Sequence, residues 1–316
     1  MERCVFVLVF ILMASFVVFM PLLANTPRGN VLLTGPSVTE QTAANGLSPP
    51  RAAGFGELAQ RSGHAVRDRL VRLSAGPDVQ LNDAELATAL QPVVGADPGR
   101  LAVGCIDLTT GASATYNSGV SIRDGGLVTA DILAALLQEH QADGTPVTSR
   151  EAELAGSMIE SGNSAATSQL WNIIGRAPGL AAANSALKLR DTSVMAVGGG
   201  DWKWTRTTIA DQLQLLADLA GPNSPLGPEA QDYALGLMAS SPAHSWDVRA
   251  GASQGTPAAV ADGSLVGPRW VVGSVGVIQH HDHELLVAVL SDHNPARGAA
   301  VKAAREAART AAGLVN

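Results

Sequence analysis

The order of the predicted secondary-structure elements is the feature that most limits the possible folds of this chain. Residues 101–108 and 112–117 alternate or run apolar around a Thr-Thr-Gly turn, which is typical of a β-hairpin. A long block with helical periodicity follows. Three more strand patterns and a closing helix then complete the chain: residues 258–261, 270–278, 285–290 and 296–312. This order predicts an α+β fold: an antiparallel β-sheet of about five strands, flanked by N- and C-terminal helices, with an inserted all-helical subdomain.

The helical patterns are regular enough to bound individual helices. Two of them precede the hairpin, at residues 57–73 and 83–90. The block after the hairpin contains six: residues 127–138, 149–160, 163–174, 180–187, 208–219 and 228–239. The start of one helix is marked by Thr148 and Glu151, which have the spacing of a capping box.

The N-terminus is apolar enough to reach across a membrane. Residues 4–24 are a 21-residue run without a charge. A secretory signal core has about 7–15 apolar residues, whereas a membrane span needs roughly 20. We therefore expect residues 1–25 to be an uncleaved signal anchor with a single membrane pass, and the body of the protein to be extracytoplasmic. Cleavage of this segment would instead give a secreted protein. Residues 26–54 read as a flexible linker, and residues 55–316 as one folded domain.

Composition excludes several classes of function. The formal net charge of −7 argues against a nucleic-acid partner, which would require basic surface. The only two cysteines, Cys4 and Cys105, cannot form a framework of disulfides, and the apolar surroundings of Cys4 make their pairing implausible. We expect no cofactor, because Gly198-Gly199-Gly200 lacks the strand-to-helix setting of a phosphate-binding loop.

Three short stretches lie where this element order places the start of a helix, a junction between two helices and a strand. Gly125-Gly126-Leu127-Val128-Thr129 opens the helix after the first hairpin, Ser161-Gly162-Asn163 joins two helices, and Val260-Ala261-Asp262-Gly263 lies on a strand. With the element order, they make the chain resemble the class A β-lactamase and penicillin-binding serine hydrolase superfamily. That family carries Ser-x-x-Lys, Ser-Asp-Asn and Lys-Thr-Gly at these places. The resemblance covers nearly all of the predicted domain.

The resemblance implies that the catalytic motifs have degenerated. It places Gly126 at the nucleophile, Thr129 at the first lysine and Ala261 at the second lysine. Glycine has no oxygen to acylate, and threonine cannot replace a lysine base. Ser161, Asn163 and Gly263 match their motifs, while Gly162 replaces the aspartate.

We therefore expect a pseudoenzyme, a binding or scaffolding module of the cell envelope whose partner is a cell-wall peptide or an envelope protein. A ligand groove would include the backbone N–H of Gly126 and be lined by Gly126, Ser161, Asn163, Asp262 and Gly263.

Two other interpretations remain open, one in which the second motif is purely structural and one in which another serine is catalytic. Ser161 and Asn163 can simply end one helix and cap the next, which is the interpretation that we favour. A relocated nucleophile, Ser161 or Ser185, would instead give a serine hydrolase acting on β-lactams or cell-wall peptides. Ser185 precedes Lys188 with the Ser-x-x-Lys spacing, but no hairpin precedes that helix.

Two other segments attract functional hypotheses. His280-His281-Asp282-His283 has metal-ligating side chains, and a metal-binding envelope protein is the alternative that it supports. We favour a solvated turn between two strands and predict no metal site, because adjacent histidines on a hairpin tip seldom converge on one ion. Residues 191–207 contain no glutamate, so we expect a structured loop anchored by Trp202 and Trp204 and not the deacylating loop of a class A enzyme.

Overall fold

The computed structural model describes residues 81–95, 100–196, 200–242 and 248–315. The predicted signal anchor at 1–25, the linker at 26–54 and the predicted helix at 57–73 lie outside the described residues, and so does Cys4. Within the described ranges, no helix combines the length and the apolar character that a membrane crossing requires. The predicted domain bounds therefore remain predictions.

A five-stranded antiparallel sheet forms the centre of the described fold, in the order β2-β1-β8-β7-β6. Its strands are β1 (Leu101–Asp107), β2 (Ser113–Tyr116), β6 (Ala258–Val266), β7 (Trp270–His280) and β8 (His283–Asn294). Strand β1 of the first hairpin thus pairs with β8, which lies near the other end of the described chain. The α+β fold and the five-stranded sheet that the sequence predicts are confirmed.

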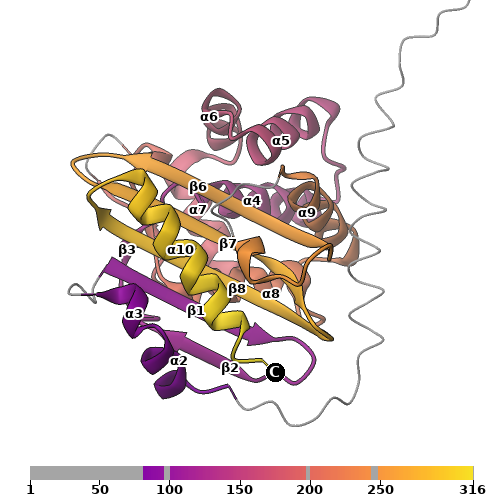
Figure 1. Cartoon of the computed structure of the whole chain (residues 1–316). Helices are drawn as coiled ribbons and strands as arrows, with labels where there is room; N and C mark the ends of the chain where they lie inside the picture. The colour runs from indigo at the N-terminus through magenta and orange to yellow at the C-terminus, as the bar shows by residue number, and fades with distance from the viewer. Residues whose placement is uncertain (1–80, 96–99, 197–199, 243–247, 316) are drawn as a thin grey trace, which may run out of the picture. The chain divides into compact units, whose positions relative to one another are not determined.

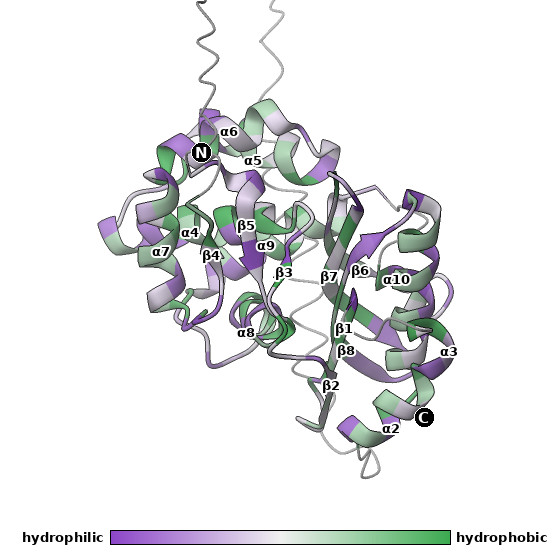
Figure 2. Ribbon diagram, turned by 90° about the vertical axis from the view of Figure 1, so that its left-hand side faces the viewer, coloured by the Kyte–Doolittle hydropathy of each residue, from purple (hydrophilic) through white to green (hydrophobic). Residues whose placement is uncertain are grey.

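Helices cover both faces of this sheet (Figure 1). One face packs against α10 (Arg297–Ala312), α2 (Asp83–Ala89) and α3 (Gln91–Val94), and the other packs against the helical block (Figure 2). Neighbouring residues of β8 enter different cores: Leu286 and Ala288 join the core on the side of the helical block, whereas Val287 and Val289 join the core under α10. Burial on both faces explains why β7 and β8 are continuous apolar runs and do not alternate.

The helical block contains α4 (Val128–Asp143), α5 (Ser149–Ser161), α6 (Ser164–Ile173), α7 (Arg176–Ala186), α8 (Ile209–Ala220) and α9 (Pro228–Ser240). The first ten residues of α4 are all buried, so this helix forms the centre of the block. The capping box predicted for α5 is present: Thr148 and Glu151 bond reciprocally at its first turn. Helix α7 begins four residues earlier than the sequence pattern indicates, at Arg176.

A second sheet, with three very short strands, was not predicted. Its order is β3-β5-β4, formed by β3 (Ile122–Arg123), β4 (Ser193–Val194) and β5 (Thr205–Thr207). Strands β6 and β8 are also longer than predicted, and β7 and β8 meet at a turn of only His281 and Asp282. These differences arise because two- or three-residue strands carry no readable period, and because Gly263 and Ser264 interrupt the apolar pattern of β6.

Cys105 lies in the middle of β1, between Ala114 of β2 and Val287 of β8. Its side chain is completely buried in the core under α10, and its thiol is free. Burial, with a smaller contribution from Asp107, raises the pKa of this thiol to about 12.

Candidate functional site

The two glycines of the first and third motifs lie against each other. Gly126 immediately precedes the N-cap residue of α4, and Gly263 is on β6. A Cβ atom added to Gly263 would lie only 2.7 Å from Cα of Gly126 and 2.5 Å from the carbonyl oxygen of Gly125. The backbones therefore touch, and the sequence-predicted proximity of Gly126 and Gly263 is found in the structure.

The backbone at the first motif has a conformation that favours glycine. The φ angle is +70° at Gly125 and +105° at Gly126, which L side chains rarely adopt. The carbonyl oxygen of Gly126 accepts a hydrogen bond from the Thr129 hydroxyl at 3.2 Å. Its N–H donates to Oδ1 of Asp124 at 2.7 Å. In the structure a carboxyl group of the chain accepts this N–H, and its expected role toward a ligand stays a prediction.

Asp124 and Asp131 are buried carboxyl groups close to this turn that the sequence analysis missed. Asp124 is fully buried; burial above all, with the neighbouring Asp131, raises its pKa to about 8. Burial likewise raises the pKa of Asp131 to about 7, and Nε2 of Gln212 lies 3.4 Å from one of its oxygens. Within the described part of the chain, Oδ2 of Asp124 has no hydrogen-bond partner. The available signal was an aspartate directly before two glycines and another inside an apolar helix.

The positions that correspond to the two family lysines do not present a cation. Thr129 is 9% exposed, and its hydroxyl donates a hydrogen bond to the Gly126 carbonyl. Ala261 is 3% exposed and belongs to the apolar core between the sheet and the helical block. Asp262, the next residue, is half-buried on β6 opposite Ser274.

The second motif acts as a helix junction. Ser161 is the exposed last residue of α5, and Gly162 caps that helix. Oδ1 of Asn163 accepts the N–H groups of Ala165 at 2.9 Å and Ala166 at 3.2 Å, so it caps α6. This geometry agrees with the helix-cap interpretation of the motif. The Asn163 oxygen thus satisfies two N–H groups in the first turn of α6.

The Ser-x-x-Lys sequence at residues 185–188 has no catalytic geometry in the described structure. Ser185 and Lys188 are both exposed at the end of α7. The backbone N–H of Lys188 donates a hydrogen bond to the backbone carbonyl of Ser185. The positive charge of Lys188 acts on Asp218 and lowers its pKa, although burial raises that pKa overall, to about 6. Lys203 lies over the ring of Trp202, 5.1 Å from its centroid.

The histidines of the β7–β8 turn have separate partners. Nδ1 of His280 lies 2.7 Å from the carbonyl oxygen of Gly251, and Nδ1 of His283 lies 3.1 Å from Oδ2 of Asp107. In the ranges that the structure describes, no three His, Cys, Asp or Glu residues are arranged to hold a metal ion. The segment therefore joins two strands and ties them to their neighbours.

The described parts of residues 191–207 contain a tryptophan anchor, as the sequence suggests. Trp202 opens the short helix η2 (Trp202–Trp204), is almost completely buried, and donates from Nε1 to the Ser168 hydroxyl at 3.1 Å. The Arg123 guanidinium lies 5.1 Å from the centroid of Trp204. Gly198 and Gly199 lie outside the described residues.

A family model described as the beta-lactamase enzyme family matches residues 141–315, which is more than half of the chain. The matched region begins inside α4, after Gly126 and Thr129. No curated protein sequence matches the chain.

Solved structures of class A β-lactamases and penicillin-binding proteins share the fold. One is a PBP-A variant in an acyl-enzyme complex with penicillin G; the identity is 18%, the TM-score is 0.64, and the match covers 74% of this chain and 97% of that one. A β-lactamase from Xanthomonas campestris is 18% identical with a TM-score of 0.63, over 76% of this chain and 100% of that one. The third is the TLA-1 β-lactamase with one serine replaced by glycine, 13% identical with a TM-score of 0.65, over 73% of this chain and 98% of that one.

Proposed function

The chain belongs to the beta-lactamase enzyme family, and from this premise we propose that it is a non-catalytic member of a hydrolase family. It serves as a binding or scaffolding module in the cell envelope, held at the membrane by residues 1–25. Its partner is a cell-wall peptide or another envelope protein.

One observation carries this proposal: the contact between Gly126 and Gly263. Restoring a serine at position 126 requires a side chain at a φ of +105°, and its Cβ would lie 3.3 Å from Cα of Gly263. A serine at position 126 would therefore need an unfavourable backbone conformation and a small shift of its neighbour. This supports a site that does not acylate at position 126.

Among the described residues, the positions of the two family lysines supply no base to the glycine pair. A serine nucleophile needs a neighbouring group to accept its proton. Thr129 and Ala261 cannot do so, and Oδ1 of the nearby Asp124 accepts the Gly126 N–H. Loss of a nucleophile or its base alone typically costs about 10³–10⁶ in rate. The combined loss supports a role in binding and not in turnover.

The test is the mass of the full-length protein after exposure to penicillin G. The purified chain, kept in detergent because of its apolar N-terminus, is incubated with the antibiotic, and its intact mass is measured. PBP-A, whose variant forms an acyl-enzyme complex with penicillin G, is the positive control. We expect an unchanged mass for this chain.

An adduct of one penicillin per chain would refute the non-catalytic role. Peptide mapping would then locate it, and the Ser161→Ala and Ser185→Ala variants would show which hydroxyl carries it. Loss of the adduct in either variant would establish the alternative, a hydrolase with a relocated nucleophile.

The envelope assignment has its own test. Full-length protein is fractionated from cells, and its N-terminal residue is determined. Recovery in the membrane fraction with residues 1–25 attached supports an anchor, whereas recovery outside the cell without them shows cleavage and secretion. Co-sedimentation with purified peptidoglycan then asks whether the partner is the cell wall.

A further inference from the structure

Helix α10 presents a basic side to solvent. Six alanines form its inward side and are buried in the core beneath it: Ala300, Ala304, Ala307, Ala308, Ala311 and Ala312. Outside this core, the helix carries four basic residues and one acidic residue: Arg297, Lys302, Arg305, Arg309 and Glu306. Arg297, Lys302 and Arg309 are exposed, and Arg305 is half-buried. These four cations are called the basic face of α10 below.

The helix itself balances little of this positive charge. Nζ of Lys302 lies 3.9 Å from Oε1 of Glu306, at the outer limit of an ion pair. Arg305 and Arg309 are four residues apart and are therefore neighbours on the helix surface. Among the described residues, no carboxylate forms an ion pair with either arginine. Like charges at this spacing weaken a helix, so the stability of α10 does not explain why both are present.

The helix dipole favours one of these cations and opposes another. Arg309 lies in the last turn, where a positive charge is favourable. Arg297 is the first residue of the helix, where a positive charge is unfavourable, and the first turn contains no acidic residue. The N-cap residue, Ala296, has no side chain that could accept a hydrogen bond. The helix therefore keeps a cation at the end where its dipole opposes it.

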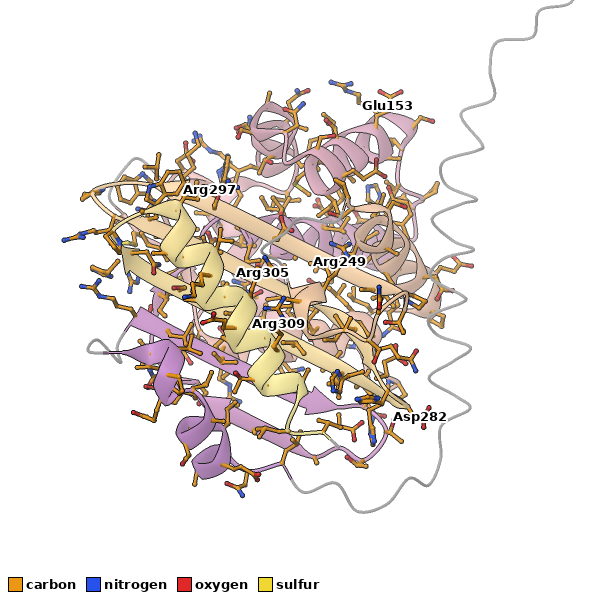
Figure 3. All side chains as sticks on the ribbon, viewed as in Figure 1. Glu153, Arg249, Asp282, Arg297, Arg305 and Arg309 are labelled. Carbon is orange, nitrogen blue, oxygen red and sulfur yellow. The ribbon has the colours of Figure 1, made fainter. Side chains whose placement is uncertain are left out.

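A fifth arginine extends the basic face beyond α10. Arg249 belongs to the short helix η3 (Val248–Gly251), which packs against α10. Its Nη2 donates to the carbonyl oxygen of Ser241 at 2.9 Å. Figure 3 shows Arg249 on the same side of the molecule as Arg297, Arg305 and Arg309. The cations therefore come from two elements that share one side of the large sheet.

Acidic residues are concentrated on the opposite side of that sheet. Residues 127–242, which include the helical block, contain twelve aspartates and glutamates and only six lysines and arginines. Figure 2 shows α10 and the helical block on opposite sides of the sheet. On the side of α10, helix α2 contributes Asp83 and Glu85, and Oδ1 of Asp83 accepts the N–H of Thr115 at 2.6 Å. Near an anionic surface, a molecule with this asymmetry turns its basic side toward the surface.

We propose that the basic face of α10 docks on the anionic headgroups of a membrane. Phosphate groups are the anions that arginine binds best, and clusters of basic residues are attracted to anionic lipid surfaces. The exposed positions of α10 include no large apolar residue, so the contact is electrostatic and does not insert into the bilayer.

This inference rests on the anchor proposed for residues 1–25. A tether raises the effective concentration of the folded body at the membrane, so that a weak contact is enough to orient it. Docking through α10 would hold the helical block and its acidic residues away from the lipid. The inference thus adds an orientation to the proposed envelope role.

The experiment measures how close α10 lies to a membrane. Full-length protein with Cys4→Ser and Ala299→Cys, at an exposed position of α10, receives a donor dye on the introduced thiol, because Cys105 is buried. It is inserted into vesicles that contain an acceptor lipid dye and consist of phosphatidylcholine, alone or in an equimolar mixture with anionic phosphatidylglycerol. We expect stronger energy transfer in the anionic vesicles, and equally weak transfer in both at 1 M NaCl, where the Debye length is about 3 Å.

Charge variants identify the residues that are responsible. Arg305→Gln combined with Arg309→Gln should reduce the ratio of docked to undocked molecules about fivefold for each charge removed. Arg305→Lys combined with Arg309→Lys keeps both charges and should keep the transfer. The matched control is Arg150→Gln combined with Arg190→Gln, which changes the net charge equally at exposed positions outside α10; it should also keep the transfer.

A second dye position tests the orientation. Ala181→Cys places the dye at an exposed position of α7, in the helical block. Its transfer should be the same in both kinds of vesicle. A rise equal to that from Ala299→Cys overturns the proposal, and so does equal transfer from α10 in the two lipids or a loss of transfer in the matched control.

A cell-wall ligand on the same face would also overturn the proposal. In that case α10 stays distant from both membranes, while the Arg305→Gln and Arg309→Gln protein loses co-sedimentation with peptidoglycan. Failure of the underlying proposal is a separate result. Recovery from cells without residues 1–25 refutes the anchor, whereas the vesicle experiment uses a chain that retains them and reports on α10. A penicillin adduct refutes the non-catalytic role without moving α10.

Discussion

Gly126 donates its backbone N–H to Oδ1 of Asp124, two residues upstream, at 2.7 Å. This hydrogen bond fixes the Gly125–Gly126 turn against β6, and its acceptor is a buried titratable group. The conformation of the turn is thus linked to the protonation state of the Asp124 carboxyl group.

The first prediction concerns the pH dependence of folding. The folded pKa values of Asp124 and Asp131, about 8 and about 7, lie above their ordinary value of 3.8. The folded state therefore binds more protons than the unfolded state between about pH 4 and pH 8. The free energy of unfolding should be greatest below this window and fall as pH rises through it, by up to about 1.4 kcal/mol per pH unit for each group.

Urea unfolding at pH 5, 6, 7 and 8 measures this slope. Asp131→Asn, which retains an oxygen to accept from Gln212, should flatten it. The matched control is Asp143→Asn, at an exposed position of the same helix, and it should leave the slope unchanged. An identical slope in wild type and Asp131→Asn would contradict the prediction.

The second prediction concerns the glycine contact. Gly263→Ala forces a Cβ to within 2.7 Å of the Gly126 backbone, where no flexible side chain can move aside. We expect a loss of about 1–3 kcal/mol in the free energy of unfolding. Gly156→Ala is the control, since a Cβ there meets nothing within 4 Å inside α5; it should stabilise by about 0.5–1 kcal/mol. Equal effects of the two variants would show that the contact is loose.

The third prediction concerns the position of the second family lysine. Ala261→Lys places an ammonium group in an apolar core where the alanine is 3% exposed. Burial of an unpaired charge is costly, and we expect the variant to lose several kcal/mol of stability or to fail to fold. The measurement is thermal unfolding of both variants. Val266→Lys, on the same strand at a residue that is 66% exposed, should unfold at nearly the same temperature as the unchanged protein. A stable Ala261→Lys protein would argue that the strand can turn this position toward solvent.

The fourth prediction separates a helix cap from a ligand contact. Asn163→Ala removes the acceptor for two N–H groups of α6 and should cost about 1 kcal/mol in chemical denaturation. Asn163→Asp retains the cap and should restore stability. Ser161→Ala, at an exposed residue, should change little. A cap role predicts this pattern with no added ligand, and an unchanged stability in Asn163→Ala would refute it.

The sequence predicted the long elements well because each carries a strong local signal. The Thr148 and Glu151 box locates the start of α5 to the residue, and burial on both faces gives β7 and β8 long apolar runs. The short strands β3, β4 and β5 have no such signal, because each has only two or three residues and because β3 pairs with β5, about 80 residues later in the chain.

The candidate site was less predictable than the fold. The proximity of Gly126 and Gly263 followed from motif order, but the acceptor for the Gly126 N–H depended on a left-handed backbone that the sequence does not display. The placement of Arg123 opposite Arg206 was missed for the same reason as their strands, since the two residues become neighbours only through the small sheet.

The seclusion of Cys105 in β1 has a practical consequence. Burial raises the thiol pKa to about 12 and leaves the residue no accessible surface, so at neutral pH the sulfur stays protonated and out of reach of a reagent while β2 and β8 flank it. Alkylation at Cys105 will therefore proceed only when the sheet comes apart. The rate of this modification, measured in a chain with Cys4→Ser, reports how often the native molecule opens at its centre.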